Sequence, residues 1–230
     1  MNPRPAVLLA GATGLVGGLA LRRWLADEHG PLLLAPVRRP LAITHPRLLE
    51  LPGGWDESSV REALAAQGAR LTAFACCLGT TIRQAGSREA FLAVDRDLVL
   101  ALGGIARRLG AGQAILVSSV GASAQSGNFY LRVKGEAERG LAALDFDRVD
   151  CLRPGLLLGE RADRRPAEAL GQRLAPLANA LARGPLQRYR AIAAADVAAA
   201  MVALCGQAGQ GRFVHEYAAL RALAQGRASA

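Results

Sequence analysis

The stretch that decides the fold reads AVLLAGATGLVG and runs from Ala6 to Gly17. Its first five residues form a continuous apolar run that stops at Gly11, and apolar residues then recur at helical spacing from Leu15 to Leu25. This order predicts a strand, a glycine turn and a helix. Glycines let a backbone turn tightly and approach a pyrophosphate, while a helix N-terminus offers free N–H groups and the positive end of its dipole. We therefore predict that this segment binds the phosphates of a dinucleotide; the alternative is an ordinary tight turn.

Outward from this motif, continuous apolar runs alternate with helical patterns. We expect strands at residues 32–37, 71–78, 114–117 and 149–152, and helices at residues 90–109 and 128–144. Continuous apolar runs are typical of strands that are covered on both faces. Because a parallel crossover is long and right-handed, this alternation predicts an α/β fold with a doubly wound parallel sheet of the Rossmann type, in a single domain over residues 1–230.

After Pro154 the pattern becomes looser. We expect helices at residues 167–181 and 195–204 and a short strand at residues 212–214. Ligands of open α/β sheets bind beyond the carboxyl ends of the strands, so we expect residues 155–230 to contribute mainly a small lid and the substrate-binding segments. The adjacent residues His215 and Glu216 point to opposite faces of a strand, which favours a surface position over an acid–base pair.

The composition is that of a globular protein. Of 230 residues, 51% are hydrophobic and 20% are charged, which excludes a disordered, collagen-like or coiled-coil chain, and the net charge of +9 attracts anions. The four cysteines form no CxxC pair and the three histidines are scattered, so we expect neither a metal site nor a disulfide framework. No apolar run is long enough to cross a bilayer, and Arg161, Arg164 and Arg165 lack interleaved aromatic residues. These features predict a cytoplasmic protein that binds a small molecule and neither nucleic acid nor a membrane.

The end of the second expected strand bears on the choice of dinucleotide. Proteins that bind NAD usually carry a carboxylate there, which accepts hydrogen bonds from the ribose hydroxyls, whereas a 2′-phosphate is bound by arginine. This chain has Arg38 and Arg39 after Val37 and no carboxylate. The sequence therefore favours NADP over NAD; the alternative is a solvated turn in an arginine-rich chain.

A second constellation lies further along the chain. Ser118 and Ser119 end the strand ILVSS, and Tyr130 is followed four residues later by Lys134, the single lysine among 28 basic residues. The i, i+4 spacing puts Tyr130 and Lys134 on one helix face, and we expect the serines to face the same crevice. A free phenol, with a pKa near 10, becomes a useful acid–base catalyst at neutral pH only where an ammonium group stabilises its anion. Arginine is too bulky to do this while also bonding a ribose, which explains the retained lysine.

Several motifs together carry a family resemblance: GATGLVGG, CCLGTT, AVDRDLV, SSVGAS, FYLRVKGEAE, CLRPGLLLGE and RAIAAADVAAAMVAL. With them the chain resembles the short-chain dehydrogenase/reductase superfamily. More narrowly, it is similar to the atypical branch that contains the Tat-interacting-protein oxidoreductases and the NmrA-like NAD(P)-binding proteins. The resemblance covers nearly the whole chain. It implies an NADP(H)-dependent oxidoreductase that transfers a hydride between the nicotinamide and a small carbonyl or alcohol substrate.

The resemblance also implies roles for individual residues. Tyr130 would be the proton donor, Lys134 would stabilise the phenolate and bind the nicotinamide ribose, and Ser119, or else Ser118, would hydrogen-bond the substrate oxygen. The remaining contacts are implied by motif position. The pyrophosphate would lie against Gly11, Thr13, Gly14, Leu15, Val16 and Gly17, the adenosine side against Cys77, Leu78 and Gly79, and the nicotinamide amide against Pro154, Gly155, Leu156 and Leu157.

Two departures from the family pattern leave a different function open. CLGTT replaces the usual asparagine-glycine signature after the fourth strand, and Asp95 stands where many relatives carry an asparagine that organises a proton-relay water. A protein that binds NADPH as a sensor, without efficient turnover, is therefore the main alternative. An isomerase or dehydratase that uses bound cofactor transiently is a further one, although the short C-terminal part argues against a bulky nucleotide-sugar substrate.

Overall fold

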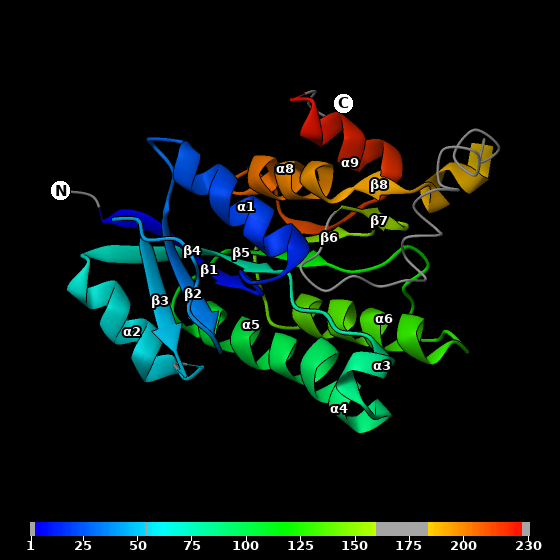
Figure 1. The fold of residues 1–230 in the computed structure, drawn as a ribbon, viewed down its shortest axis with the longest axis horizontal. Coiled ribbons are helices and arrows are strands. Elements are labelled where there is room, and N and C mark those ends of the chain that lie inside the picture. Colours follow the sequence, from blue (N-terminus) through cyan, green and yellow to red (C-terminus); the bar gives the residue numbers. More distant parts are fainter. Residues whose placement is uncertain (1–2, 54, 160–183, 227–230) are drawn as a thin grey trace.

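The computed structural model describes residues 3–53, 55–159 and 184–226. Its centre is a seven-stranded sheet in the order β3-β2-β1-β4-β5-β6-β9, in which every neighbouring pair is parallel (Figure 1). The prediction of a doubly wound α/β domain is confirmed. The direction of winding reverses between β1 and β4, where folds of this kind open a crevice at the carboxyl ends of the strands.

The elements of the first half of the chain follow one another as strand and helix. They are β1 (Arg4–Ala10), α1 (Leu15–Ala26), β2 (Leu32–Val37), β3 (Leu48–Pro52), α2 (Glu57–Ala66), β4 (Ala69–Cys76), α3 (Ile82–Ala85), α4 (Arg88–Leu92), η1 (Ala93–Asp97) and α5 (Leu98–Arg108). The second half continues with β5 (Gln113–Val117), α6 (Phe129–Ala142), β6 (Arg148–Leu152), β7 (Leu157–Leu158), η2 (Gly184–Tyr189), β8 (Ile192–Ala193), α8 (Ala194–Leu204), β9 (Gly211–His215) and α9 (Tyr217–Ala224).

Helices cover both faces of the sheet. Helices α1, α8 and α9 lie on one face, and α2, α5 and α6 lie on the other (Figure 1). The side chains of β1 show why the strands had to be apolar throughout. Val7 and Leu9 pack toward α1 and α8, while Leu8 packs toward α5, and all three are fully buried. Strand β1 therefore contributes to two hydrophobic cores at once, one on each face of the sheet.

Several elements differ from the expectations, among them the helices α3 and α9, which were not expected. Neither β3 nor α2 was expected, because β3 is an edge strand of mixed polarity and α2 has only Val60 and Leu64 buried. The single helix expected at residues 90–109 is interrupted, since η1 is one wide π-helical turn between α4 and α5. The helix expected at residues 167–181, with Arg161, Arg164 and Arg165, lies outside the described residues.

Several described segments after Pro154 belong to the main sheet and its helical layer. Strand β9 extends the main sheet beside β6, and α8 packs against α1 with Val197, Met201 and Leu204 fully buried. Helix α8 is part of the core because it is apolar on nearly every side, whereas β9 is a partly exposed edge strand. Of the described residues after Pro154, Gly155 and Leu156 line the cavity together with Leu157 of the short β7–β8 pair.

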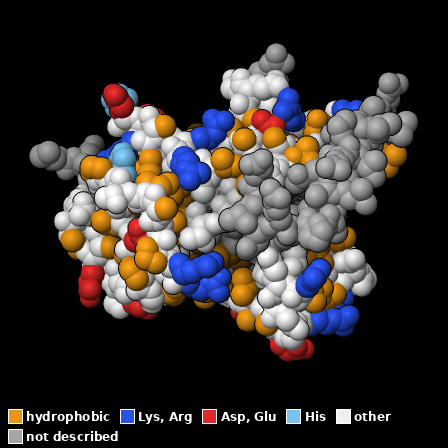
Figure 2. Space-filling model, in the orientation of Figure 1, with side chains coloured by type: hydrophobic (Ala, Val, Ile, Leu, Met, Phe, Trp, Pro, Cys, Tyr) orange, Lys and Arg blue, Asp and Glu red, His pale blue; other side chains and the backbone are white. Residues whose placement is uncertain are grey.

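The surface seen in Figure 2 carries its basic side chains in several separate groups, with hydrophobic and uncharged atoms between them. Among the described residues, no helix is long and apolar enough to span a membrane.

Candidate functional site

The glycine turn between β1 and α1 is shaped by two close approaches of backbone. Gly11 has a φ of +85°, and a Cβ there would lie 2.7 Å from the carbonyl carbon of Cys77. A Cβ on Gly17 would lie 2.2 Å from the carbonyl oxygen of Gly11. Only glycine fits at either position, so the turn, the start of α1 and the end of β4 are locked together. Gly14 closes the turn by donating its N–H to the Gly11 carbonyl at 2.9 Å.

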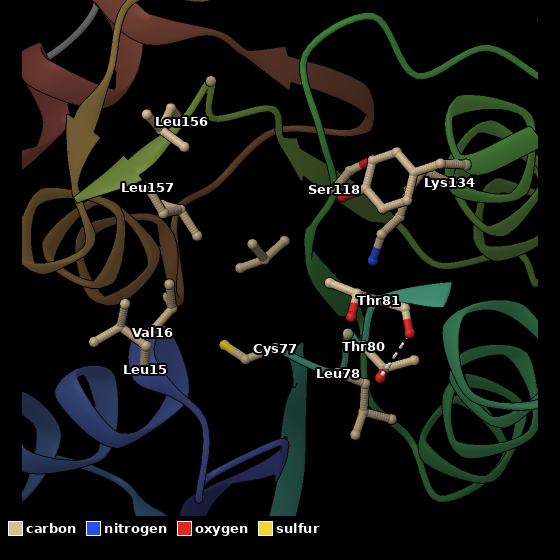
Figure 3. A pocket seen from close by; sticks show the side chains of 14 residues that line it. Leu15, Val16, Cys77, Leu78, Thr80, Thr81, Ser118, Lys134, Leu156 and Leu157 are labelled. Carbon is tan, nitrogen blue, oxygen red and sulfur yellow. Dashed lines mark hydrogen bonds between the residues drawn. The ribbon is translucent and has the colours of Figure 1, made fainter. Parts of the chain in front are cut away.

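A cavity of about 320 Å³ opens at the carboxyl ends of β1, β4 and β5. Its lining comes from the start of α1, the loop after β4, the end of β5, helix α6 and the segment after β6. The lining residues are Leu15, Val16, Cys77, Leu78, Gly79, Thr80, Thr81, Val117, Ser118, Tyr130, Lys134, Gly155, Leu156 and Leu157. Figure 3 shows an apolar side formed by Leu15, Val16 and Leu157 opposite a polar side formed by Ser118 and Lys134.

The two serines differ in position. Ser118 lines the cavity and is 6% exposed, and its buried hydroxyl oxygen has no hydrogen-bond partner among the described residues. Ser119, predicted to be the more important serine, is not among the lining residues, and its hydroxyl lies 3.4 Å from the Val120 carbonyl. Burying a polar group without a hydrogen-bond partner costs free energy, so the Ser118 hydroxyl is available to form a hydrogen bond with a ligand in the cavity.

Tyr130 and Lys134 both line the cavity from α6, as their i, i+4 spacing predicted. Lys134 is 4% exposed, and its Nζ lies 2.8 Å from Oδ1 of Asp95, a fully buried carboxylate. Burial lowers the pKa of the Lys134 ammonium, but Asp95, Tyr130 and Cys76 raise it, and the result lies above the ordinary value. Lys134 is therefore held as a buried cation in an ion pair.

The other predicted contact residues fall into three groups. Those that line the cavity are Leu15, Val16, Cys77, Leu78, Gly79, Gly155, Leu156 and Leu157. Those that are not among the lining residues but belong to the same turn or segment are Gly11, Thr13, Gly14, Gly17 and Pro154, and those that neither line the cavity nor belong to these segments are Arg38 and Arg39. Both arginines are exposed at the end of β2 and take part in no ion pair within the described part of the chain. Thr80, Thr81 and Val117 are additional lining residues; polar residues just after a strand's carboxyl end were the available signal for the two threonines.

The cysteine of the cavity does not have the properties of a reactive thiol. Burial raises the pKa of Cys77, and its Sγ lies 3.6 Å from the sulfur of Met201. Burial raises the pKa of Cys76 to about 12. Both thiols therefore stay protonated at physiological pH, which argues against a role as redox centres. Cys76 is the last residue of β4 and is buried, whereas Cys77 lies just beyond that strand and is partly exposed.

His215 is a correction to the sequence analysis. It was expected at the surface, but its Nε2 lies 2.8 Å from Oδ1 of Asp150, which is fully buried. Asp150 also accepts hydrogen bonds from Arg148 and Gln113. The i, i+1 rule separates His215 from Glu216 but does not say which of them faces inward. This network ties β5, β6 and β9 together, and its members do not line the cavity.

Comparison with known proteins places the chain in a family. It is 35% identical over 208 residues to the mitochondrial protein fmp52 of Emericella nidulans, covering 87% of this chain and 89% of that protein. The chain belongs to the FMP52 and HTATIP2 family of atypical short-chain dehydrogenase/reductases. Rat HTATIP2 is 46% identical over 98 residues, which cover 43% of this chain and 40% of that protein. No protein-family model matches the sequence.

Solved structures support the fold assignment. MoeE5 in complex with UDP-glucose and NAD superposes with a TM-score of 0.65 over 91% of this chain and 74% of that chain, at 17% identity.

The cytoplasmic location expected from the sequence is contradicted, because several FMP52 relatives are named as mitochondrial proteins. That expectation rested on the absence of long apolar runs and on cysteine usage, and neither property distinguishes one aqueous compartment with reduced thiols from another.

Proposed function

We propose that this family member is an NADP(H)-dependent oxidoreductase that interconverts a small carbonyl compound and its alcohol. The observation that carries the proposal is the convergence of Ser118, Tyr130 and Lys134 on one cavity that also borders the N-terminus of α1. The cavity fits a dinucleotide in two respects. The tight glycine turn brings the first residues of α1, Leu15 and Val16, to the wall of the cavity, and the unpartnered Ser118 hydroxyl needs a bond from outside the chain.

Each group then has a role in carbonyl reduction. When bound, a nicotinamide dinucleotide supplies the hydride. Tyr130 gives its phenolic proton to the carbonyl oxygen, Ser118 donates a hydrogen bond to the same oxygen, and Lys134 stabilises the phenolate that remains. We assign the serine role to Ser118 and not to Ser119, because Ser118 lines the cavity. The apolar side formed by Leu15, Val16 and Leu157 excludes water from the reacting atoms.

The preference for NADP is supported by Arg38 and Arg39. They follow β2, the neighbour of β1 in the sheet, and their charges are not neutralised by any carboxylate among the described residues. A charge-assisted bond to the 2′-phosphate contributes roughly 1.5–3 kcal/mol, so we expect NADPH to bind about 10- to 100-fold more tightly than NADH. Calorimetric titration of both nucleotides measures this ratio. Arg38→Ala should reduce it, whereas Arg23→Ala, on the exposed side of α1, should not. Equal affinities in the parent would overturn the NADP assignment.

A second candidate function is cofactor sensing without efficient turnover. The ion pair of Lys134 with Asp95 favours it, since the carboxylate offsets the positive charge that the phenolate needs. The two functions differ in what Tyr130 does. For an enzyme, Tyr130→Phe should lower the rate of NADPH consumption by roughly 10²- to 10⁴-fold with little change in NADPH affinity.

The serine pair supplies an internal control for the same assay. Ser118→Ala should slow turnover, while Ser119→Ala should leave it close to that of the parent, because the Ser119 hydroxyl is turned toward the Val120 carbonyl. A panel of small aldehydes, ketones and quinones provides the substrates. If the parent binds NADPH but reduces no member of the panel, the sensing function is favoured; if Ser119→Ala alone abolishes turnover, the assignment of Ser118 fails.

A further inference from the structure

Asp95 occupies an unusual position in the fold. It lies in η1, the wide π-helical turn between α4 and α5, and it is fully buried although its neighbours in the turn reach the surface. A π-turn inside a helix costs hydrogen-bond geometry, and such turns often occur at functional sites. Here the turn directs a carboxylate toward α6 and the loop after β4.

Both carboxylate oxygens of Asp95 are engaged, and by different elements. Oδ1 lies 2.8 Å from Nζ of Lys134 on α6. Oδ2 accepts a hydrogen bond of 2.9 Å from the backbone N–H of Thr80, which lies in the loop after β4. The amino group of Lys134 points toward the loop that carries Thr80 and Thr81 (Figure 3). Asp95 is therefore the bridge between the lysine and one border of the cavity.

The Asp95–Lys134 ion pair lies directly against the loop after β4 at Gly79. A Cβ on Gly79 would come within 3.5 Å of the Lys134 Nζ and 3.6 Å of the Asp95 Oδ1. The loop, the carboxylate and the ammonium thus form one packed unit, with Gly79, Thr80 and Lys134 on its cavity side.

We propose that Asp95 is a positioning residue that keeps Lys134 charged and fixes it to the loop of residues 78–81, so that lysine and loop meet a bound cofactor as one rigid unit. The proposal deepens the proposed function, since it concerns the same site. It does not require that the protein turn over a substrate, because the charge state of Lys134 is a property of the free protein.

The surroundings of Lys134 explain why a carboxylate is needed. The titratable groups that face it are Asp95 from η1, Tyr130 from its own helix, Cys76 from β4 and Cys77 just beyond β4. Burial lowers the pKa of the ammonium, and Asp95 is the largest of the influences that raise it again. Without the negative charge of Asp95, burial would prevail and the amine would lose its proton at a lower pH.

Because Lys134 is the single lysine of the chain, its charge can be measured directly. Protein labelled with ¹⁵N,¹³C-lysine gives one Cε–Nζ correlation, and the chemical shift of Nζ reports protonation. In the parent we expect the ammonium to stay charged to pH 10. In Asp95→Asn, which keeps an oxygen for the Thr80 N–H, we expect its titration midpoint to fall by about two pH units or more.

Asp97 provides a matched control in the same π-turn. Its carboxylate is exposed and pairs with Arg96 at 2.7 Å. Asp97→Asn removes the same charge from the protein and should leave the Lys134 titration where it is in the parent. If Asp95→Asn titrates Lys134 as the parent does, or if Asp97→Asn shifts it equally, the proposal is overturned.

NADPH affinity gives a second readout. For Asp95→Asn, we expect the dissociation constant to rise several-fold between pH 7 and pH 9, and we expect no such rise for the parent or for Asp97→Asn. In a Lys134→Met background the added Asp95→Asn change should have no pH-dependent effect, because its target is gone. Absence of NADPH binding by the parent would refute the proposed function and leave the lysine titration to decide this inference.

A folding defect in Asp95→Asn would not remove the test. If Asp95 serves Lys134, then Lys134→Met leaves a buried carboxylate without its cation, and adding Asp95→Asn should restore part of the lost stability. A double variant that melts below Lys134→Met would show that Asp95 stabilises the fold independently of the lysine, and the proposal would fail.

Discussion

The contact between Gly17 and the Gly11 carbonyl gives the sharpest prediction for the glycine turn. In Gly17→Ala the new Cβ would start 2.2 Å from the Gly11 oxygen, whereas real Cβ contacts essentially never fall below 3.0 Å. The start of α1 must therefore move by about 0.8 Å or more, and overpacking of this kind typically costs about 1–3 kcal/mol. Gly18→Ala is the matched control, because its Cβ would meet only the Ala12 carbonyl, at 3.3 Å. An alanine within a helix gains up to about 1 kcal/mol over glycine.

That gain applies to both positions, because both lie in α1, so the two variants should differ by about 1–3 kcal/mol in the free energy of unfolding. For a domain of this size that difference corresponds to roughly 2–12 °C in melting temperature, with Gly17→Ala the lower. Urea and thermal unfolding measure it. Gly17→Ala should also be stabilised less by NADPH, because the displaced helix carries Leu15 and Val16 away from the cavity. Equal stabilities for the two variants would show that α1 accommodates the methyl group without moving, and the argument from close approach would fail.

Three further predictions concern the turn and two buried networks. Gly14→Val should remove the NADPH-induced rise in melting temperature with little effect on the free protein, since a Cβ there meets only the Gly11 carbonyl at 3.2 Å; an unchanged rise would refute a phosphate site. Glu138 is fully buried between Arg153 and Arg212, so Glu138→Gln should lower the free energy of unfolding by about 1–3 kcal/mol, while Glu57→Gln, at a partly exposed ion pair, should unfold at nearly the parent's urea midpoint. Burial raises the pKa of Asp150, but hydrogen bonds from His215, Arg148 and Gln113 bring it below its ordinary value of 3.8. Its contribution to stability is then complete above that value and is lost as the pH falls through the lower folded value, so the advantage of the parent over Asp150→Asn should shrink below about pH 4 in pH-dependent denaturation.

The fold could be predicted from the sequence because the central strands are buried on both faces and therefore appear as continuous apolar runs. Runs such as Leu32–Val37 leave no polar residue to confuse the pattern, and all six residues are buried. The edge strand β3 could not be recognised in the same way, since its partly exposed residues mix Leu with Glu50. The π-turn was also hidden, because one wide turn barely disturbs a helical pattern that spans residues 90–109.

The site was predictable in its parts but not in its contacts. Tyr130 and Lys134 share a face because they share a helix, so spacing alone placed them. Which of Ser118 and Ser119 faces the cavity depends on how β5 and the loop beyond it are oriented, and the residue pattern does not fix this. The pairing of Lys134 with Asp95 joins residues from different helices, and only the packing of η1 against α6 brings them together.

The burial of a solitary lysine also makes the protein a reporter of its own unfolding. A protease that cuts only after lysine has one target in the chain, the bond after Lys134, which lies inside α6 and is shielded in the folded protein. Cleavage requires that α6 unfold locally. At low protease concentration the cleavage rate is therefore proportional to the population of molecules in which α6 is unfolded. A ligand that settles in the cavity against α6 would slow that single cut, and binding could then be followed as the persistence of one intact band.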